Sequence, residues 1–295
     1  MKRLIFIFII CIIMFSSCIN EEKKEPLALD TLVLRYAESE KEGSYQAQLS
    51  NYFASLVEEK SNGKIIIKVY YNGELGTEEE VLTQLQFGGI ALGRVNLLSL
   101  SQQIPSFRST FFPYLNSSFT KTLDFINNNK NFNFAFQNEK LFPLITLYPS
   151  SRCVYSDESL DQINYNELKI GIDNSYMYEK FLKRWGANPI VIGDIDTFPS
   201  LRNGFIDARE SSLSSFLTCD EYPYIQDVVI LENVCLPSFI TISNEVLNQL
   251  SKQELEILIN CAKDTQAYAK SFIEIEEIKA INKISYDKNI RELYE

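Results

Sequence analysis

Short apolar stretches with the pattern of β-strands recur along most of the chain. In residues 64–71, Ile65, Ile67 and Val69 lie two residues apart, so an extended chain places all three on one face. Other stretches are equally short and rich in apolar residues. We predict strands at 32–37, 64–71, 90–98, 141–148, 168–172, 189–192 and 204–207.

Segments with a helical period separate several of these strands. Leu49, Phe53 and Val57 recur at the spacing of one helical face. A Ser or Thr followed three residues later by Glu forms a capping box, which begins a helix. These signals predict helices near 49–60, after Thr77, at 175–185, and from Ser251 almost to the C-terminus.

The alternation of strands and helices indicates an α/β architecture with largely parallel sheets. No glycine-rich loop follows a predicted strand, because the Gly-Gly pair within residues 87–90 comes after a helix. The sequence therefore gives no support for a nucleotide-binding fold.

The N-terminus has the parts of an export signal. A basic start precedes a 12-residue apolar run from Leu4 to Phe15, and a charged stretch follows after residue 20. The apolar run is too short to cross a bilayer of about 30 Å as a helix. We therefore predict a signal peptide at 1–17 and an extracytoplasmic protein.

Small residues directly before Cys18 suggest a lipoprotein signal, in which Cys18 becomes the lipidated first residue. Phe15 and Ser17 differ from the commonest motif of this kind, which has Leu and then Gly or Ala at these places. The alternatives are an ordinary cleaved signal and an uncleaved anchor. Residues 18–29 are expected to form a tether.

Composition narrows the classes of function. The 295 residues contain no histidine, so the usual general base, the Ser-His and Cys-His pairs and the commonest zinc ligand are missing. We predict a protein that is not an enzyme, with no metal and no cofactor. The net charge of −11 becomes −13 without the signal, and such an acidic protein repels nucleic acid.

The four cysteines outside the N-terminal region form no Cys-x-x-Cys pair, so a zinc or redox site has no support. We interpret them as small buried apolar residues, with room for one disulfide. They are Cys153, Cys219, Cys235 and Cys261.

Six segments resemble, in order and spacing, motifs of the substrate-binding proteins of tripartite ATP-independent periplasmic (TRAP) transporters. The resemblance extends from about residue 30 to about residue 265. The segments are NGELG at 72–76, QLQFGGIALGRVN at 84–96, FPY at 112–114, NELKI at 166–170, GANP at 186–189 and LRNGFIDARE at 201–210.

This resemblance implies two α/β lobes around a ligand-binding cleft, joined by hinge strands and a long helix that crosses both lobes. Lobe 1 is expected at 30–146 plus about 231–250, and lobe 2 at 147–230 plus about 251–295. The resemblance also implies a receptor, in the periplasm or at the cell surface, that delivers a small organic acid to TRAP-type membrane permease subunits. Family members commonly continue with a further strand-like piece and a helix, so the last helices here are expected to be short.

The resemblance also suggests ligand contacts. Arg152 stands where the family has its first arginine, and a guanidinium binds a carboxylate through two parallel hydrogen bonds. Its alternative is a surface arginine on a loop. Glu210 matches the glutamate of a family motif, and Ser211 replaces the asparagine that often follows it.

Three further residues are candidates because of their places along the chain. Asn174 and Glu38 follow predicted strands, and α/β clefts bind ligands at the carboxyl ends of strands. Phe198 lies near a predicted helix start and is a candidate for lining the cleft. The alternative for Glu38 is a solvated loop residue.

One expected residue is missing. The family's most characteristic arginine corresponds to Gly171 here. Loss of one partner of a buried charge pair costs about 2–5 kcal/mol, so a simple monocarboxylate in the usual pose is doubtful. Three interpretations remain open: another cation, with Arg94 a candidate, replaces it; the ligand is less acidic or more apolar; or the protein binds no transported solute.

The leading hypothesis is therefore a lipoprotein receptor for a TRAP-type permease. The alternative within the binding class is a diverged lipoprotein that takes an apolar or sugar-like molecule. An exported hydrolase based on two carboxylates has no motif that requires it. A purely structural surface lipoprotein is the remaining alternative.

Overall fold

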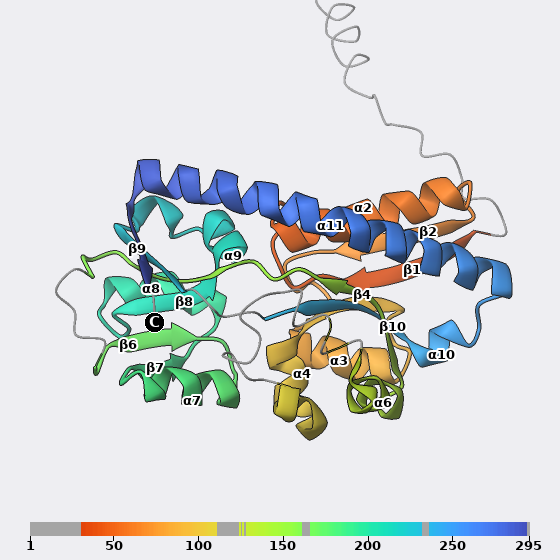
Figure 1. Ribbon diagram of the computed structural model, residues 1–295, viewed down its shortest axis with the longest axis horizontal. Helices are drawn as coiled ribbons and strands as arrows, with labels where there is room; N and C mark the ends of the chain where they lie inside the picture. Colours follow the sequence, from red (N-terminus) through yellow and green to blue (C-terminus); the bar gives the residue numbers. More distant parts are fainter. Residues whose placement is uncertain are drawn as a thin grey trace, which may run out of the picture. The chain divides into compact units, whose positions relative to one another are not determined.

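The computed structural model describes residues 31–110, 124, 126, 128–160, 166–231 and 236–293. Strands and helices alternate along most of this part of the chain, and the strands form two sheets (Figure 1). Residues 32–295 form one compact unit.

The first sheet has five strands in the order β2-β1-β3-β10-β4. β1 pairs in parallel with β2 and β3, whereas β10 lies antiparallel between β3 and β4. The bounds are Leu32–Ala37 for β1, Ile65–Tyr70 for β2, Leu92–Asn96 for β3, Leu141–Leu147 for β4 and Ser238–Ser243 for β10.

The second sheet has six strands in the order β11-β9-β5-β8-β6-β7. Here β5 is the antiparallel strand, and the other neighbours run in parallel. The bounds are Arg152–Ser156 for β5, Lys169–Ile172 for β6, Asn188–Val191 for β7, Ala208–Ser212 for β8, Asp227–Leu231 for β9 and Asn289–Leu293 for β11.

The helices begin where the sequence supplies caps. Thr77 and Ser251 each form a complete capping box with the Glu three residues later. The helices are α2 (Tyr45–Lys60), α3 (Glu78–Gln86), α4 (Leu97–Gln103), α6 (Lys130–Asn138), α7 (Tyr176–Arg184), α8 (Asp194–Arg202), α9 (Leu213–Thr218), α10 (Asn244–Leu247) and α11 (Lys252–Asp287). Two 3-10 turns are η1 (Pro105–Thr110) and η2 (Tyr222–Tyr224).

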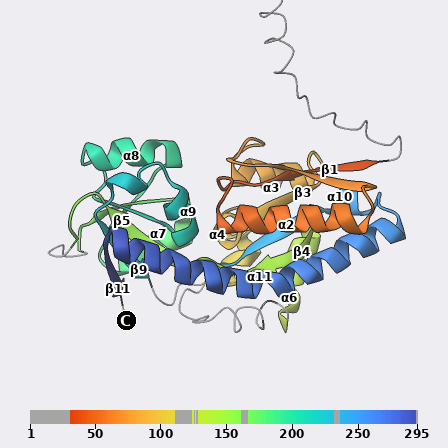
Figure 2. The same ribbon diagram turned by 90° about the horizontal axis from the view of Figure 1, so that it is seen from above.

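Helix α11 has 36 residues and connects elements of the two sheets. It packs against α2 and β4 near the first sheet and against α9 and β11 near the second (Figure 2). Its Glu277 accepts hydrogen bonds from the Ser150 hydroxyl at 2.7 Å and from the Ser151 amide. The connection from β4 to β5 is therefore tied to the helix.

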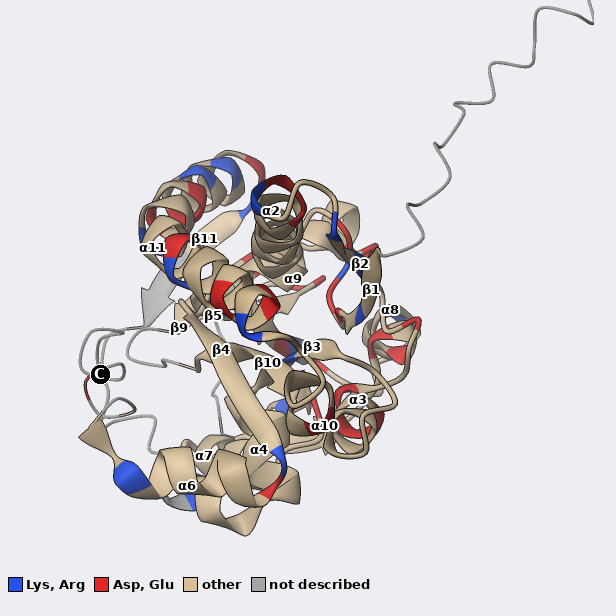
Figure 3. Cartoon of the chain, turned by 90° about the vertical axis from the view of Figure 1, so that its right-hand side faces the viewer, with Lys and Arg blue, Asp and Glu red and all other residues tan. Residues whose placement is uncertain are grey.

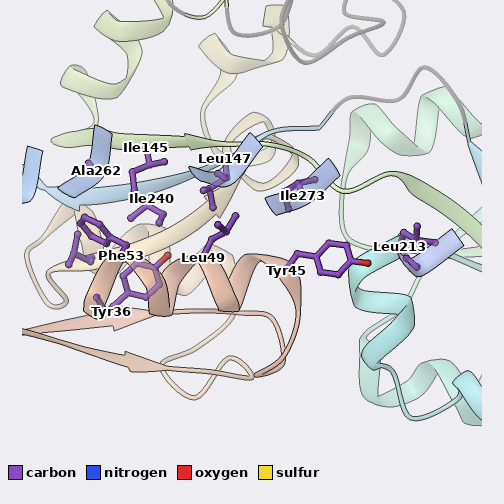
Figure 4. Close-up of a cluster of buried hydrophobic side chains, with 14 of the residues drawn as sticks. Tyr36, Tyr45, Leu49, Phe53, Ile145, Leu147, Leu213, Ile240, Ala262 and Ile273 are labelled. Carbon is purple, nitrogen blue, oxygen red and sulfur yellow. The ribbon is translucent and has the colours of Figure 1, made fainter. Parts of the chain in front are cut away.

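Two apolar clusters make up the buried core, and each contains residues of both sheets. One of them surrounds α2, where Leu49 and Phe53 are fully buried (Figure 4). The same cluster includes Leu213 of α9 and Ile273 of α11. The core is thus continuous through the elements that connect the sheets.

Most of the predicted elements are confirmed, but the structure also contains the unpredicted strands β5, β9 and β10, and it differs from the predictions at three further places. The strand predicted at 204–207 is wrong, because Gly204, with φ of +71°, turns the chain out of α8 and the strand begins at Ala208. The strand predicted at 90–98 ends at Asn96, whose side chain accepts from the Ser99 amide and caps α4. Beyond α11 the chain forms β11, which the sequence did not predict.

The three described cysteines, Cys153, Cys219 and Cys261, are free thiols, and Cys153 and Cys261 are buried as expected for small apolar residues. Cys235 lies outside the described residues. Within the described part of the chain, no helix is long and apolar enough to cross a membrane.

Candidate functional site

Arg94 lies in a buried cluster of charged side chains in the first sheet. It is carried by β3, and Glu38 directly follows the neighbouring strand β1. Arg94 Nε donates to Glu38 Oε1 at 2.7 Å, and the two side chains are 3% and 0% exposed. Burial opposes the charge, but the carboxylates of Glu38, Glu78 and Glu40 raise the pKa of Arg94 above its ordinary value.

Three carboxylates surround this one guanidinium. Glu40 and Glu78 lie 3.7 Å and 3.5 Å from Arg94 Nη2, in addition to Glu38. Burial, together with the nearby Glu38, raises the pKa of Glu40. We call Glu38, Glu40, Glu78 and Arg94 the Arg94 cluster, in which negative charges outnumber positive ones by two.

Arg152 and Glu210 form a bidentate ion pair in the second sheet. Arg152 Nε donates to Oε1 at 2.6 Å and Nη2 donates to Oε2 at 2.7 Å. The Tyr178 hydroxyl donates to the same Oε1 at 2.7 Å, and its ring centre lies 5.8 Å from the Arg152 guanidinium carbon. Both predicted residues are therefore brought together, with the Arg152 side chain 11% exposed and Glu210 1% exposed.

A third buried guanidinium, Arg209, was not singled out from the sequence. Its Nη2 donates to Asp173, which follows β6, and to Asp194 Oδ1 at 3.0 Å, at the start of α8. Burial disfavours the charged form of Arg209, but these carboxylates stabilise it. The pKa of Arg209 is therefore raised. The partial desolvation of Asp173 is outweighed by the guanidinium groups of Arg209 and Arg152, which lower the pKa of this half-exposed carboxyl.

Gly171 lies directly beside Arg209. The two residues are in register on the parallel strands β6 and β8, so their side-chain directions share one face of the sheet. A Cβ atom at Gly171 would lie 2.8 Å from Ile206 Cδ1, 2.9 Å from Ile192 Cγ2 and 3.4 Å from Arg209 Cδ. A side chain at position 171 has no room in this arrangement.

Hydrogen bonds connect segments near the Arg94 cluster to segments of the second sheet. The Ser215 hydroxyl donates to Glu40 Oε2 at 2.7 Å, and Asn174 Nδ2 donates to Glu79 Oε1 at 3.1 Å. Acidic residues gather at the starts of α3 and α8 (Figure 3). Charged groups of the two sheets thus lie near hydrogen bonds that join α9 and the end of β6 to segments beside the first sheet.

The other predicted residues lie in different surroundings. Ser211 is in register with Cys153 and, by strand alternation, lies on the opposite face from Glu210. The ring of Phe198 packs against Tyr224, with ring centres 4.8 Å apart. Cys18 lies outside the described residues.

The arrangement is suited to binding a polar molecule. Three guanidinium groups offer N–H donors, and carboxylates and hydroxyls offer acceptors. In the part of the chain that the structure describes, no group of three or more Cys, Asp or Glu residues is placed to hold a metal ion. Arg209, Asp173 and Asp194 could have been suspected from the sequence only if the pairing of β6 with β8 had been known.

The sequence model of the bacterial extracellular solute-binding proteins, family 7, matches residues 36–293. The chain belongs to this family. Its recognition as a solute-binding protein of the TRAP type is thereby confirmed.

Individual relatives are distant. A solute-binding protein of Chromohalobacter salexigens is 22% identical over 220 residues, which cover 72% of this chain and 64% of the relative. The ectoine-binding periplasmic protein TeaA of Halomonas elongata is 24% identical over 260 residues, covering 86% of this chain and 74% of the relative. The chain thus spans just under two thirds of the first of these relatives.

A solved structure agrees with the fold. The TRAP periplasmic solute-binding protein of Pseudomonas putida F1, with bound D-glucuronate, has a TM-score of 0.80 at 19% identity and covers 89% of this chain and 88% of its own. The expected two-lobed α/β solute-binding fold is confirmed by this likeness.

Proposed function

We propose that this family 7 protein is an extracytoplasmic receptor that binds a small organic solute and delivers it to TRAP-type permease subunits. One observation carries the proposal beyond family membership. Buried guanidinium groups from both sheets lie near the hydrogen bonds that join Ser215 of α9 to Glu40 and Asn174 to Glu79 of α3. A solute held between these segments would contact polar groups of both sheets at once.

The proposed division into lobes follows the sheets. The first-sheet strands fall within 30–147 and 231–250, and the second-sheet strands within 147–231 and 251–295. These ranges support the division into lobes expected from the sequence, with β4 and β9 each ending one residue past the expected boundary.

The proposal does not include catalysis. Glu210 is held by Arg152, and Asp173 and Asp194 are held by Arg209. These ion pairs give each of the carboxylates a structural role, and no motif in the sequence requires two of them to act together on a substrate. The carboxylate hydrolase considered from the sequence therefore gains no support.

Binding is tested by calorimetry and by the thermal unfolding of the full chain in detergent, with sugars, sugar acids, dicarboxylates and compatible solutes. A solute at 100 times its Kd should add about 2.7 kcal/mol to the free energy of unfolding. A Ser215→Ala variant should weaken binding while Ser271→Ala, on an exposed part of α11, should not. The proposal fails if no solute of any of these classes binds.

Lipid attachment at Cys18 is part of the same proposal, supported by the short apolar run and the small residues before it. Mass spectrometry of the protein from membranes should find a diacylglyceryl group on Cys18. The Cys18→Ser variant should lack that group and should no longer be recovered among the lipid-modified proteins. An unmodified Cys18 within a protein that retains residues 1–17 would show an uncleaved anchor instead.

A further inference from the structure

Arg209 has one guanidinium nitrogen without a partner. Its Nη2 binds Asp173 and Asp194, whereas Nη1 is buried and has no hydrogen-bond acceptor among the residues that the structure describes. An unsatisfied buried donor of this kind is energetically unfavourable, and more so when the group is charged. Nη1 is therefore ready to donate to an oxygen atom supplied from outside the chain.

The side chain is held firmly in this place. Arg209 is 1% exposed, and its Cδ lies over Gly171 beside Ile192 and Ile206. Tyr155, in register with Arg209 on β5, is also buried and donates to Glu221 Oε1 at 2.8 Å. The stem of Arg209 thus has little freedom, and the direction of Nη1 is fixed by packing.

The two acids that bind Nη2 are open to solvent. The side chain of Asp173 is 53% exposed and that of Asp194 is 93% exposed. Arg209 therefore lies just beneath an accessible surface, next to Asn174, whose amide reaches Glu79 of α3. The guanidinium thus lies close to polar groups that solvent reaches.

The charges around this position disfavour an anion. The positive charge of Arg209 lies near two carboxylates, that of Arg152 near one and that of Arg94 near three. Negative charges thus outnumber positive charges by three across these groups. A like charge brought close to these carboxylates raises the energy of the complex.

We propose that Arg209 Nη1 is a ligand contact, and that it donates to an oxygen of a solute without net negative charge. This inference rests on the proposed function. Such a solute is either uncharged and rich in hydroxyl groups or zwitterionic, and in both cases its oxygen accepts from Nη1 without adding to the local negative charge. Glycine at position 171 lets Ile192, Ile206 and the stem of Arg209 pack closely together, and the negative charges of Asp173 and Asp194 disfavour an anionic solute.

The test uses pairs of probes that differ in charge on the full chain in detergent, by calorimetry. The pairs are D-galactose with D-galacturonate, D-glucose with D-glucuronate, and zwitterionic ectoine with succinate. The member without net negative charge should bind at least tenfold more tightly. Arg209→Gln should weaken that binding at least tenfold, whereas Arg202→Gln, an exposed arginine on α8, should leave it unchanged.

A second variant retains Arg209 and tests whether the negative charges of Asp173 and Asp194 disfavour anionic solutes. Asp173→Asn with Asp194→Asn removes two negative charges and should improve binding of the anionic members at least tenfold. A wild-type preference for anions, or solute binding that does not respond to Arg209→Gln, overturns the inference but leaves the receptor function intact. Absence of binding by every probe, in the wild type and in the double variant, overturns the receptor function as well.

Discussion

Each of the three buried arginines is held by carboxylates from a neighbouring strand or loop, and the Arg152–Glu210 pair is the clearest case. Truncating Glu210 to Ala leaves a guanidinium that is 11% exposed without its bidentate partner. We expect Glu210→Ala to lower the free energy of unfolding by about 3 kcal/mol, measured by urea denaturation. The exposed pair of Glu179 and Lys183 is the control, and Lys183→Ala should cost less than about 0.5 kcal/mol.

A substitution at Gly171 tests how tightly the side chains around this residue are packed. Gly171→Ala places a Cβ within 3.0 Å of two isoleucine side chains, so the neighbours must shift. We expect a loss of about 1–3 kcal/mol in the free energy of unfolding. Gly89→Ala is the control, because its nearest contact would be 3.5 Å, and a similar loss there would show that the effect is not one of packing.

Part of the candidate site could be predicted from the sequence at the level of single residues. Arg152, Glu210, Arg94 and Glu38 were singled out, yet each was treated as a separate ligand contact. The structure joins them in pairs, because strand neighbours far apart in sequence are brought together. Arg209 was missed for the same reason: its significance depends on the register between β6 and β8, which no local pattern reveals.

At the scale of single elements, the start of α11 gives a pH prediction. Hydrogen bonds from the Ser251 hydroxyl and amide lower the pKa of Glu254. A carboxylate whose pKa is lower in the folded protein stabilises it above the unfolded pKa, near 4.3, and loses this effect as the pH falls through the folded value.

Glu254→Ala should therefore destabilise the protein by about 1 kcal/mol at pH 7, and the difference from the wild type should shrink below about pH 4. Urea denaturation at a series of pH values measures this. Glu256→Ala, an exposed residue on the same helix, should show no such trend. A difference that stays constant to pH 3 would contradict the assignment to the capping box.

Elements with strong local signals were predicted well, and those fixed by distant partners were not. The capping boxes of α3 and α11 were read directly from the sequence. By contrast, β5, β9, β10 and β11 were not predicted as strands, and each is paired with strands far away in the chain. The helical turn of α4 replaced the end of a predicted strand because Asn96 caps it.

At the scale of the whole molecule, the shared core predicts cooperative unfolding. Both apolar clusters contain residues of both sheets, and α11 packs against elements of each. Trp185 is the single tryptophan and packs on Phe181 of α7, so its fluorescence reports on the second sheet. Its urea midpoint should coincide with that of far-UV circular dichroism, which reports on all helices.

The variant Ile273→Ala, at a buried position of α11, should move both midpoints together by the equivalent of about 2–5 kcal/mol. Separate transitions, with only one of them shifted, would mean that the sheets unfold independently. The fold class itself was predictable from alternating patterns, whereas this coupling depends on packing that the sequence does not display.

The crowding around Gly171 also limits the order in which substitutions can accumulate in evolution. An arginine at position 171 would bring its Cβ within 3.0 Å of both Ile192 and Ile206, so those side chains would have to shift. Smaller residues at those two positions would relieve the crowding, but each would open a cavity in the second sheet. A change of solute is therefore expected to proceed more readily through the exposed Asp173 and Asp194 than through position 171.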